Sequence, residues 1–423
     1  MIDEIFAQEM GGRLVFRDLS VLSPHYIPDE LPHREEEAGE ISKIVAPVLR
    51  GERSNNIFLY GKTGTGKTCV VKYVAKKLEE AAQKEQKIPV DSKIKVLYSN
   101  CKIHSSRYQV LIHVLEDEFF QNKELRDSPL EGRADSHLTG LTPGDLYERL
   151  VKVINSNNLH LIIVLDEIDV VKDLDDLVYA LTRINDELKH GQLALIGISN
   201  KYGFKDKLDP RSKSTLCESE LVFKPYNASQ MKTILQQRVK LGFKEGAIRD
   251  SEVGLIAAIA AKTNGDARYG LRLLQKTGEI AKREEKTLVT EEHVRKARNK
   301  VEEDLISDVV SSLPEHQQIV LYSIAESLLS GINQKKLSGL DQETLSSGEV
   351  YEAYEQISRK LNRKPRTLRW FREYLNDLEM LGLITLTISG KGVRGNTTLI
   401  RLGYSPQDIK RIVIHGLGLE VGM

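Results

Sequence analysis

The 423-residue sequence predicts an α/β protein in which a parallel sheet is followed by a helical bundle and then by a separate C-terminal domain. Two observations support this fold class. Between about residues 50 and 222, apolar strand-like runs alternate with helical patterns, which is typical of a parallel sheet covered on both faces. Residues 228 to about 308 contain helical patterns without such runs, and beyond about residue 310 helices precede two apolar runs separated by a glycine-rich, basic turn.

The expected elements follow from the positions of apolar runs and stop signals. Four strands are expected in "NNIFLY", "KIKVLYSN", "LHLIIVLDE" and "QLALIGISN". In the bundle, Asn264-Gly265 predicts a helix end and Thr290 predicts the cap of the next helix. The polar, irregular segment from 121 to 145 is expected to be an insertion or a mobile loop. We therefore expect domains at residues 1–223, 224–308 and 309–423.

Composition excludes several classes of protein. No run of about 18 apolar residues occurs, and the first residues, "MIDEIFAQEMGG", lack the apolar core of a secretory signal. Cys69, Cys101 and Cys217 are odd in number and widely spaced, which favours a reducing interior over a disulfide framework or a zinc site. A cytoplasmic location is therefore expected. The formal net charge of zero does not exclude nucleic acid, because binding depends on a local basic face.

A nucleotide-binding loop is predicted by "GKTGTGKT", which spans Gly61 to Thr68 with the full G-x-x-x-x-G-K-T spacing. The glycines let the backbone curl so that several N–H groups point at one anion, and the start of the next helix adds its dipole. Lys67 would neutralise charge on the β- and γ-phosphates, and Thr68 would place its hydroxyl on Mg²⁺. The alternative is a glycine-rich turn between a strand and a helix that binds nothing.

Two further strand ends supply candidate partners for this loop. Asp166 and Glu167 follow a buried strand at the edge of the sheet where α/β proteins bind ligands. Asp166 would hold Mg²⁺ through the metal's waters and Glu167 would polarise the attacking water, unless both carboxylates merely leave the strand. Asn200 ends another strand and suits the positioning of a water, although Asn at a strand end is more often a turn residue. Asp169 is expected to be a cap or a surface charge.

Arg268 in "NGDARYGLRLL" lies in the first turn of a predicted helix. A cation at this positive end of the helix dipole is unfavourable by roughly a few tenths of a kcal/mol. A bound phosphate nearby would make the free energy of a cation at this position favourable. On charge alone, a nucleotide contact and a solvated arginine are equal alternatives.

The C-terminal domain contains the pattern of a helix-turn-helix module. Pro365 is expected to be the first residue of a helix. Leu368, Phe371, Leu375 and Leu378 recur at spacings of three and four, so they are expected to face inward together.

A basic face is expected on the same module. Arg363, Arg366 and Arg369 repeat every three residues near the helix start, which is the end that enters a DNA groove, and the hairpin tip adds Lys391 and Arg394. Residues 359–411 contain twelve Lys and Arg against four Asp and Glu, as expected of a DNA-binding face. A protein-interaction module with a solvated basic face is the alternative.

These motifs together resemble the archaeal replication-initiator family, relatives of eukaryotic origin recognition complex subunit one and cell division control protein six. The matching pieces, from about residue 15 to 410, are "YIPDELPHREEE", "YGKTGTGKT", "LDEID", "GISN", "KLDPRSKS", "FKPYNASQMKTILQQR", "NGDARYGLRLL" and the C-terminal hairpin. Their order and spacing are specific. The resemblance implies an AAA+ ATPase domain with a P-loop parallel sheet and a helical lid, followed by a winged-helix domain.

The resemblance also implies roles for single residues. Nucleotide-binding positions are Gly61, Lys62, Thr63, Gly64, Thr65, Gly66, Lys67, Thr68 and Cys69 in the loop, Pro28, Leu31 and Arg34 over the adenine, and Tyr226 and Arg238 in the lid. Asp166 and Glu167 match the Walker B motif, Asn200 matches sensor one and Arg268 matches sensor two. Arg211 matches the arginine-finger position, but Ser212 follows it where the family usually has valine, so a loop cation is the alternative.

DNA contacts are implied at two places in the chain. Those in the winged helix are Arg363, Lys364, Arg366, Arg369, Lys391 and Arg394. A second contact is expected from an inserted helix within 104–140, with Arg107, Lys123, Arg126 and Arg133 as candidates.

The function implied is an ATP-dependent initiator that binds double-stranded origin DNA and helps recruit a replicative helicase of the minichromosome maintenance type. Slow hydrolysis of ATP to ADP, with Mg²⁺, would act as a switch. Paralogous initiators would be further partners, and the protein would be nucleoid-associated in the cytoplasm. Two alternatives are a nucleotide-gated winged-helix transcription regulator and a scaffold that traps ADP without turnover.

Overall fold

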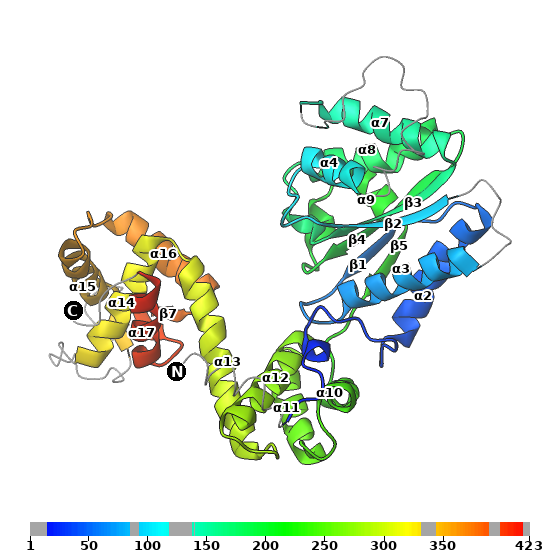
Figure 1. Cartoon of the computed structure of the whole chain (residues 1–423). Helices are drawn as coiled ribbons and strands as arrows, with labels where there is room; N and C mark the ends of the chain where they lie inside the picture. Colours follow the sequence, from blue (N-terminus) through cyan, green and yellow to red (C-terminus); the bar gives the residue numbers. More distant parts are fainter. Residues whose placement is uncertain are drawn as a thin grey trace. The chain divides into compact units, whose positions relative to one another are not determined.

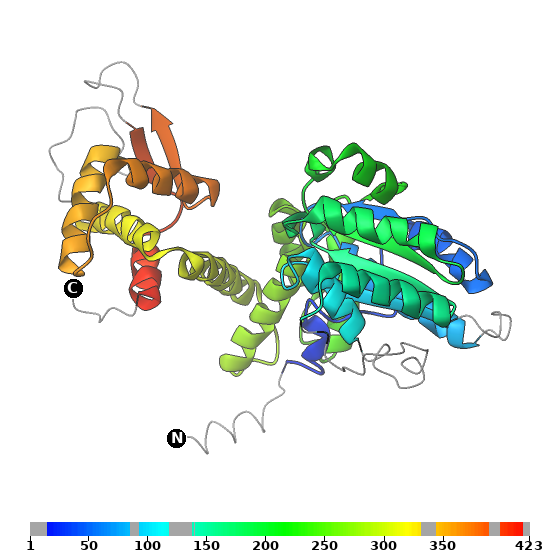
Figure 2. The ribbon, with the colours of Figure 1, turned by 90° about the horizontal axis from the view of Figure 1, so that it is seen from above.

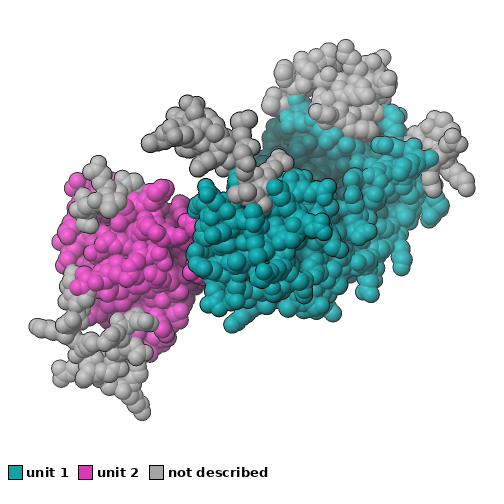
Figure 3. Space-filling model, turned by 60° about the horizontal axis from the view of Figure 1, so that its bottom comes forward, with its two compact units in different colours: residues 1–297 teal, residues 298–423 magenta. Residues whose placement is uncertain are grey.

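The chain forms two compact units. The structure is a computed structural model that describes residues 15–84, 93–117, 138, 140–330, 344–388 and 398–417. Unit 1 comprises residues 1–297 and unit 2 comprises residues 298–423 (Figure 3). The long helix α13 (Glu291–Ser312) begins in unit 1 and ends in unit 2.

Unit 1 contains a parallel sheet of five strands in the order β2-β3-β4-β1-β5. The strands are β1 (Ile57–Tyr60), β2 (Lys93–Asn100), β3 (Leu159–Asp166), β4 (Gln192–Ser199) and β5 (Ser219–Val222). The four expected strands are confirmed, whereas the sequence pattern does not predict β5 because its four residues contain no apolar run. The order reverses at β1, so the loop that follows β1 lies where α/β sheets bind ligands.

Helices cover both faces of this sheet (Figure 1). One core lies against α2 (Glu35–Val45) and α3 (Lys67–Lys84), and the other lies against α4, α7, α8 and α9. The bounds of these four are Arg107–Glu116, Pro143–Ser156, Leu174–Glu187 and Pro210–Leu216. Alternate residues of β3 enter the two cores, which is why this strand is an unbroken apolar run.

The remainder of unit 1 is helical, as expected. Its helices α10 (Ala228–Gly242), α11 (Asp250–Lys262) and α12 (Ala267–Arg283) are called the lid below (Figure 2). Asn264 and Gly265 have φ values of 66° and 64°, and this left-handed pair ends α11 as predicted. The next helix, α13, begins directly after Thr290. Short 3₁₀ helices lie at Ser20–Leu22, Ala46–Arg50, Ile168–Val170 and Phe204–Lys207.

Unit 2 combines helices with a three-stranded antiparallel sheet around one core. The helices are α14 (Glu315–Ser330), α15 (Ser347–Lys360), α16 (Leu368–Met380) and α17 (Pro406–Gly416), and the strands are β6 (Thr344–Ser346), β7 (Ile384–Ile388) and β8 (Thr398–Leu402). The expected hairpin is confirmed, because β7 pairs antiparallel with β8. Among the described residues, none of the helices is long and apolar enough to cross a membrane.

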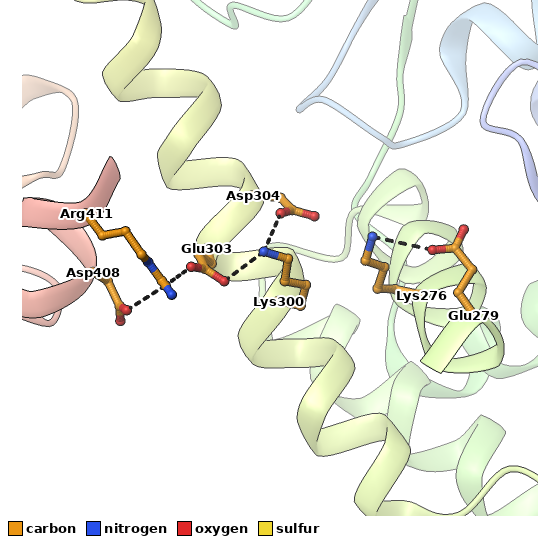
Figure 4. A network of polar contacts seen from close by, with 7 residues as sticks. All are labelled: Lys276, Glu279, Lys300, Glu303, Asp304, Asp408 and Arg411. Atoms are coloured by element: carbon orange, nitrogen blue, oxygen red, sulfur yellow. Dashed lines mark hydrogen bonds and ion pairs between the residues drawn. The ribbon is translucent and has the colours of Figure 1, made fainter. Parts of the chain in front are cut away.

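An ion pair fastens α17 to the part of α13 that belongs to unit 2 (Figure 4). Arg411 pairs with Asp408 on its own helix and with Glu303 on α13. Lys300 pairs with Glu303 at 3.0 Å and with Asp304 at 3.5 Å. The second half of α13 is therefore an integral part of unit 2.

The start of α16 differs from the prediction. Pro365 is not the first helical residue, because α16 begins at Leu368 after Thr367. Phe371, Leu375 and Leu378 are buried as expected, but Leu368 is 44% exposed and does not face the core. The residues directly before the helix form no regular secondary structure, and hydrogen bonds from α15 hold the backbone of Arg366 in place.

Candidate nucleotide site and nucleic-acid interface

The loop between β1 and α3 is shaped by two glycines in the left-handed region. Gly64 has φ +70° and Gly66 has φ +93°, which side chains disfavour. Both also lie against other parts of unit 1. A Cβ at Gly66 would lie 2.7 Å from the Tyr226 hydroxyl, and a Cβ at Gly64 would overlap the Asp266 carboxylate. The loop is thus packed beneath the lid and the segment that leads to it.

Lys67 is buried within this loop. Its ammonium donates to the carbonyl oxygens of Gly61 at 2.7 Å and Lys62 at 2.8 Å. The pKa of Lys67 is lowered to about 8, chiefly by burial and to a lesser extent by the nearby Arg268, while Asp166, Asp266 and Glu167 oppose this shift. A desolvated ammonium held by neutral carbonyls is suited to an anion, because a phosphate would stabilise its charged form.

Asp166 ends β3 beside the loop, and two hydroxyls share one of its oxygens. Thr68 Oγ1 donates to Asp166 Oδ2 at 2.7 Å, and Tyr98 of β2 donates to the same oxygen at 2.5 Å. Burial and this hydrogen bond raise the pKa of Tyr98, so its phenol stays protonated and acts as a donor. The Asp166 carboxylate is therefore oriented from two strands and the first turn of α3.

Glu167 and Asp169 follow Asp166 in a tight turn. Glu167 has φ 56° and pairs with Lys102 at 2.7 Å. The expectation that Asp169 is a cap or a surface charge is wrong, since its side chain is only 6% exposed. It accepts a hydrogen bond from Ser199 Oγ at 2.9 Å and pairs with Lys201 at 3.0 Å. Asp169 thereby joins the end of β3 to the end of β4.

Asn200 lies directly after β4, at the same edge of the sheet as Asp166. It is half-buried and stands between Ser199 and Lys201, both of which are held by Asp169. A polar side chain therefore lies at the end of this strand, as predicted, and Asp169 holds the residues on either side of Asn200.

Arg268 belongs to the first turn of α12, as predicted. Asp266 caps this helix by accepting from the backbone N–H groups of Arg268 at 2.7 Å and Tyr269 at 3.2 Å. Ala267 N donates to Gly64 O at 3.0 Å, which brings the helix start onto the loop. The positive charge of Arg268 also acts on Lys67 and Tyr98, so the structure places it beside the loop.

Arg34 is buried and contacts α2, the phosphate loop and the segment that leads into the lid. Its Nε donates to Thr65 O at 3.0 Å, and its other nitrogens bind Lys224 O at 2.5 Å and Glu37 Oε1 at 2.6 Å. The guanidinium also lies 4.2 Å from the centre of the Tyr226 ring. These contacts hold the loop against the segment that enters the lid.

The other predicted nucleotide contacts include both buried and exposed residues. Arg238 of α10 is buried and donates to Val21 O and Tyr26 O, both at 3.3 Å, and its charge acts on the half-buried Cys69. Pro28 is buried, and Leu31 packs against the core that includes α3. Lys62 and Thr63 are exposed on the loop, and Arg211 is exposed at the start of α9, where Asp209 caps its backbone N–H.

The oxygen ligands at this site fit Mg²⁺. Thr68 and Asp166 offer hard oxygens 2.7 Å apart, and Mg²⁺ prefers one or two such protein ligands together with waters and substrate phosphates. Within the described parts of the chain, no group of three or more His, Cys, Asp or Glu side chains could hold a metal ion. Any ion here would therefore depend on the nucleotide for the rest of its ligands.

The predicted DNA-contacting residues of unit 2 are arranged differently from the expectation. Arg369 lies in the first turn of α16, but Arg363, Lys364 and Arg366 lie in the non-helical segment before it, so the expected helical spacing of the arginines is wrong. All four side chains are exposed, and Arg363 pairs with Glu315 of α14 at 2.7 Å.

Several predicted DNA contacts cannot be placed. Lys391 and Arg394, with Lys123, Arg126 and Arg133, lie outside the described residues. Arg107 starts α4, and its backbone N–H donates to Asp173 at 2.8 Å.

Sequence reasoning missed three residues that build the nucleotide site. Asp266 carries a readable signal, because Asp before a helix is a preferred cap. Tyr98 and Lys102 carry none, since their partners Asp166 and Glu167 are more than sixty residues away in the chain.

Models of three protein families match the chain. They are the AAA ATPase domain over residues 30–196, the Cdc6 AAA+ ATPase-type lid domain over 232–299, and the Cdc6 C-terminal winged helix domain over 308–412. The parallel sheet with its lid and the winged helix that follows are thus the fold class that the sequence predicts.

Similar proteins cover nearly the whole chain. ORC1-type DNA replication proteins from Thermococcus onnurineus and Thermococcus kodakarensis are each 40% identical, over 99% and 98% of this chain and 95% and 94% of their own lengths. The solved structure of the Aeropyrum pernix ORC1 protein in complex with DNA is 37% identical, with a TM-score of 0.77 over 96% of this chain and 98% of that one.

Proposed function

The chain belongs to the family of ORC1-type DNA replication proteins, and we propose that it is an ATP-dependent initiator that binds double-stranded origin DNA and helps recruit the replicative helicase. One observation carries this proposal. The phosphate loop is hydrogen-bonded to the start of the lid through Gly64 and Ala267, so that occupancy of the loop can be transmitted to the lid. The Aeropyrum pernix relative is described in complex with DNA, which supports DNA as the partner.

Nucleotide binding would reorganise contacts that the loop already makes. Lys67 would exchange its two carbonyl partners for the β- and γ-phosphates, with Arg268 approaching the γ-phosphate from the lid. Thr68 and Asp166 would hold Mg²⁺, which supplies charge neutralisation at the phosphates. We assign the adenine contacts to Pro28 and Leu31, with Arg34 and Arg238 supporting them through the backbone carbonyls they bind and Tyr226 through its ring contact with Arg34.

Hydrolysis would be slow and regulatory. Glu167 would orient the attacking water with Asn200, but it is paired with Lys102 at 2.7 Å and must leave this ion pair first. Arg211 is exposed and would act only on a nucleotide bound by a neighbouring copy.

We place the nucleotide-binding domain at residues 1–223, the helical lid domain at 224–308 and the winged-helix domain at 309–423.

DNA binding would use the basic surface of unit 2. Arg369 at the start of α16 would enter the groove, and Arg363, Lys364 and Arg366 would contact phosphates beside it. Lys391 and Arg394 would extend the contact from the hairpin.

Footprinting on the host's own replication origin tests this function. We expect protection of origin repeats that changes between ATP and ADP, whereas scrambled DNA stays unprotected. The variant Glu167→Gln should bind ATP and release phosphate at a much lower rate. Equal protection of origin and scrambled DNA in every nucleotide state would overturn the proposal, as would genome-wide occupancy of promoters instead of origins.

A further inference from the structure

Residues 363–366, which we call the basic strap, connect α15 to α16 without regular secondary structure. Asn362, at φ 54°, ends α15 and redirects the chain into the strap. Arg363 N donates to Ser358 O at 2.8 Å, which anchors the first strap residue. The strap exposes the side chains of Arg363, Lys364 and Arg366, so three of its four residues carry accessible positive charge.

Two tyrosines of α15 hold the far end of the strap. Tyr351 Oη donates to the carbonyl oxygen of Arg366 at 3.1 Å, and the backbone N–H of Arg366 donates to Tyr354 Oη at 3.1 Å. Both backbone polar groups of one residue are therefore satisfied by side chains of a single helix. A segment outside helices and sheets has no regular backbone partners of its own, so these hydroxyls set its path.

The tyrosines are themselves rigidly placed. Tyr354 is fully buried, and its Oη lies 2.8 Å from Nδ1 of His316 on α14. The rings of Tyr351 and Tyr354 pack against Phe371 of α16, with centroids 5.1 and 5.8 Å apart from its ring. The strap backbone is thus tied to α14, α15 and α16 together.

We propose that Tyr351 and Tyr354 are positioning residues for DNA binding, which preorganise the basic strap so that its cations meet phosphate groups without first becoming ordered. Neither hydroxyl needs to touch DNA. A loose strap would lose backbone and side-chain freedom on binding, and that lost entropy would weaken the complex. This inference rests on the proposed binding of DNA by unit 2.

The test compares variants in which the strap is no longer held in position with a variant in which the strap loses one contact to DNA. Tyr351→Phe and Tyr354→Phe remove only the hydroxyls, and a fluorescein-labelled duplex of random sequence is a suitable probe because phosphate contacts are independent of sequence. We expect each variant of the full chain to bind this duplex about three- to tenfold more weakly. The slope of log affinity against log salt should stay unchanged, because the same phosphates are contacted.

Arg366→Ala provides the contrasting result, since it removes a contact. It should weaken binding and also reduce the salt slope by about 0.9. Tyr322→Phe is the matched control, because this tyrosine of α14 lies against Lys410 of α17, whose ammonium is 5.9 Å from the centre of its ring. It should bind the duplex as the unaltered protein does.

Amide hydrogen exchange of free protein supplies a readout that does not depend on DNA. Peptides covering 361–367 should exchange faster in both hydroxyl-removing variants, while the rest of unit 2 exchanges as before. If Arg366→Ala weakens DNA binding but neither tyrosine variant does, the positioning role is overturned. If exchange accelerates but neither Arg366→Ala nor the tyrosine variants affect binding, the proposed DNA interface at the strap is wrong, and the positioning role falls with it.

Discussion

Ala267, the first residue of α12, donates its backbone N–H to the carbonyl oxygen of Gly64 at 3.0 Å. The phosphate loop and the lid are therefore joined backbone to backbone. Asp266, the cap of α12, lies so near to Gly64 that any Cβ there would overlap its carboxylate. The missing side chain at position 64 is what allows this approach.

We expect Gly64→Ala to weaken ADP binding at least about tenfold. The left-handed φ of +70° costs an alanine about 1–2 kcal/mol, and the added Cβ also pushes Asp266 and the start of α12 away from the loop. Titration with a fluorescent ADP analogue would measure the loss.

Gly246→Ala is the control that separates the strain of a left-handed backbone from the overlap of a new Cβ with a neighbouring side chain. Gly246 has φ +74°, but nothing lies within 4 Å of a Cβ there. This variant should lose stability by about 1–2 kcal/mol and bind ADP normally. If it weakened ADP binding as much as Gly64→Ala does, the contact between loop and lid would not be the cause.

ADP affinity should depend on pH through Lys67. Burial lowers its pKa to about 8, and a bound phosphate would raise that pKa by stabilising the ammonium. Below pH 8 the ammonium is already present, so affinity should be flat. Above pH 8 each unit should reduce the affinity by up to about tenfold, because binding must then take up a proton. The phosphates of ADP titrate near pH 6 and do not interfere.

Calorimetry in two buffers of different ionisation enthalpy checks this linkage. Proton uptake should appear above pH 8 and vanish in Lys67→Arg, since arginine stays charged throughout this range. An unaltered protein whose ADP affinity is constant from pH 7 to about pH 10 would contradict the shifted pKa of Lys67.

The sequence was sufficient to predict features that depend on local periodicity. The apolar run from 159 to 165 is buried on both faces of the sheet, so its strand and the polar Asp166 at its end were readable. The helix stop at Asn264-Gly265 was readable because left-handed residues have a strong preference for these types.

Features that depend on distant partners were not predictable. Pro365 favours a helix start, but the hydroxyls of Tyr351 and Tyr354 bind the backbone of Arg366 and keep the chain non-helical there. Asp169 resembles a surface charge in sequence, yet it binds Ser199 at the end of another strand and Lys201 just beyond that end. In both cases tertiary hydrogen bonds override the local preference.

Removal of the Arg34 side chain should destabilise unit 1. Arg34→Ala leaves the carbonyls of Thr65 and Lys224 and the carboxylate of Glu37 without their partner, which we expect to cost about 3 kcal/mol. The melting temperature of the unit should fall by roughly 5–10 °C. Differential scanning calorimetry would measure it.

Arg50→Ala is the matched control for Arg34. Arg50 also pairs with a glutamate at 2.6 Å, but the side chains of Arg50 and Glu52 are 62% and 57% exposed. Solvent screens such a pair, so the melting temperature should not change measurably. Equal effects of the two substitutions would show that the buried contacts of Arg34 do not support the loop.

We expect Glu315 to compete with DNA for Arg363. The two side chains form an ion pair at 2.7 Å and are about half exposed, so a phosphate can displace the carboxylate. Glu315→Gln should therefore strengthen binding to a random-sequence duplex by about two- to fivefold at low salt, and the gain should fade as salt screens the pair.

Glu302→Gln controls for the loss of one negative charge from unit 2. Glu302 pairs with Arg298 on α13 at 2.8 Å, and neither belongs to the basic strap. Fluorescence anisotropy at several salt concentrations should show a gain for Glu315→Gln only. If both variants gained equally, net charge alone would explain the effect, and Arg363 would have no special part in holding DNA.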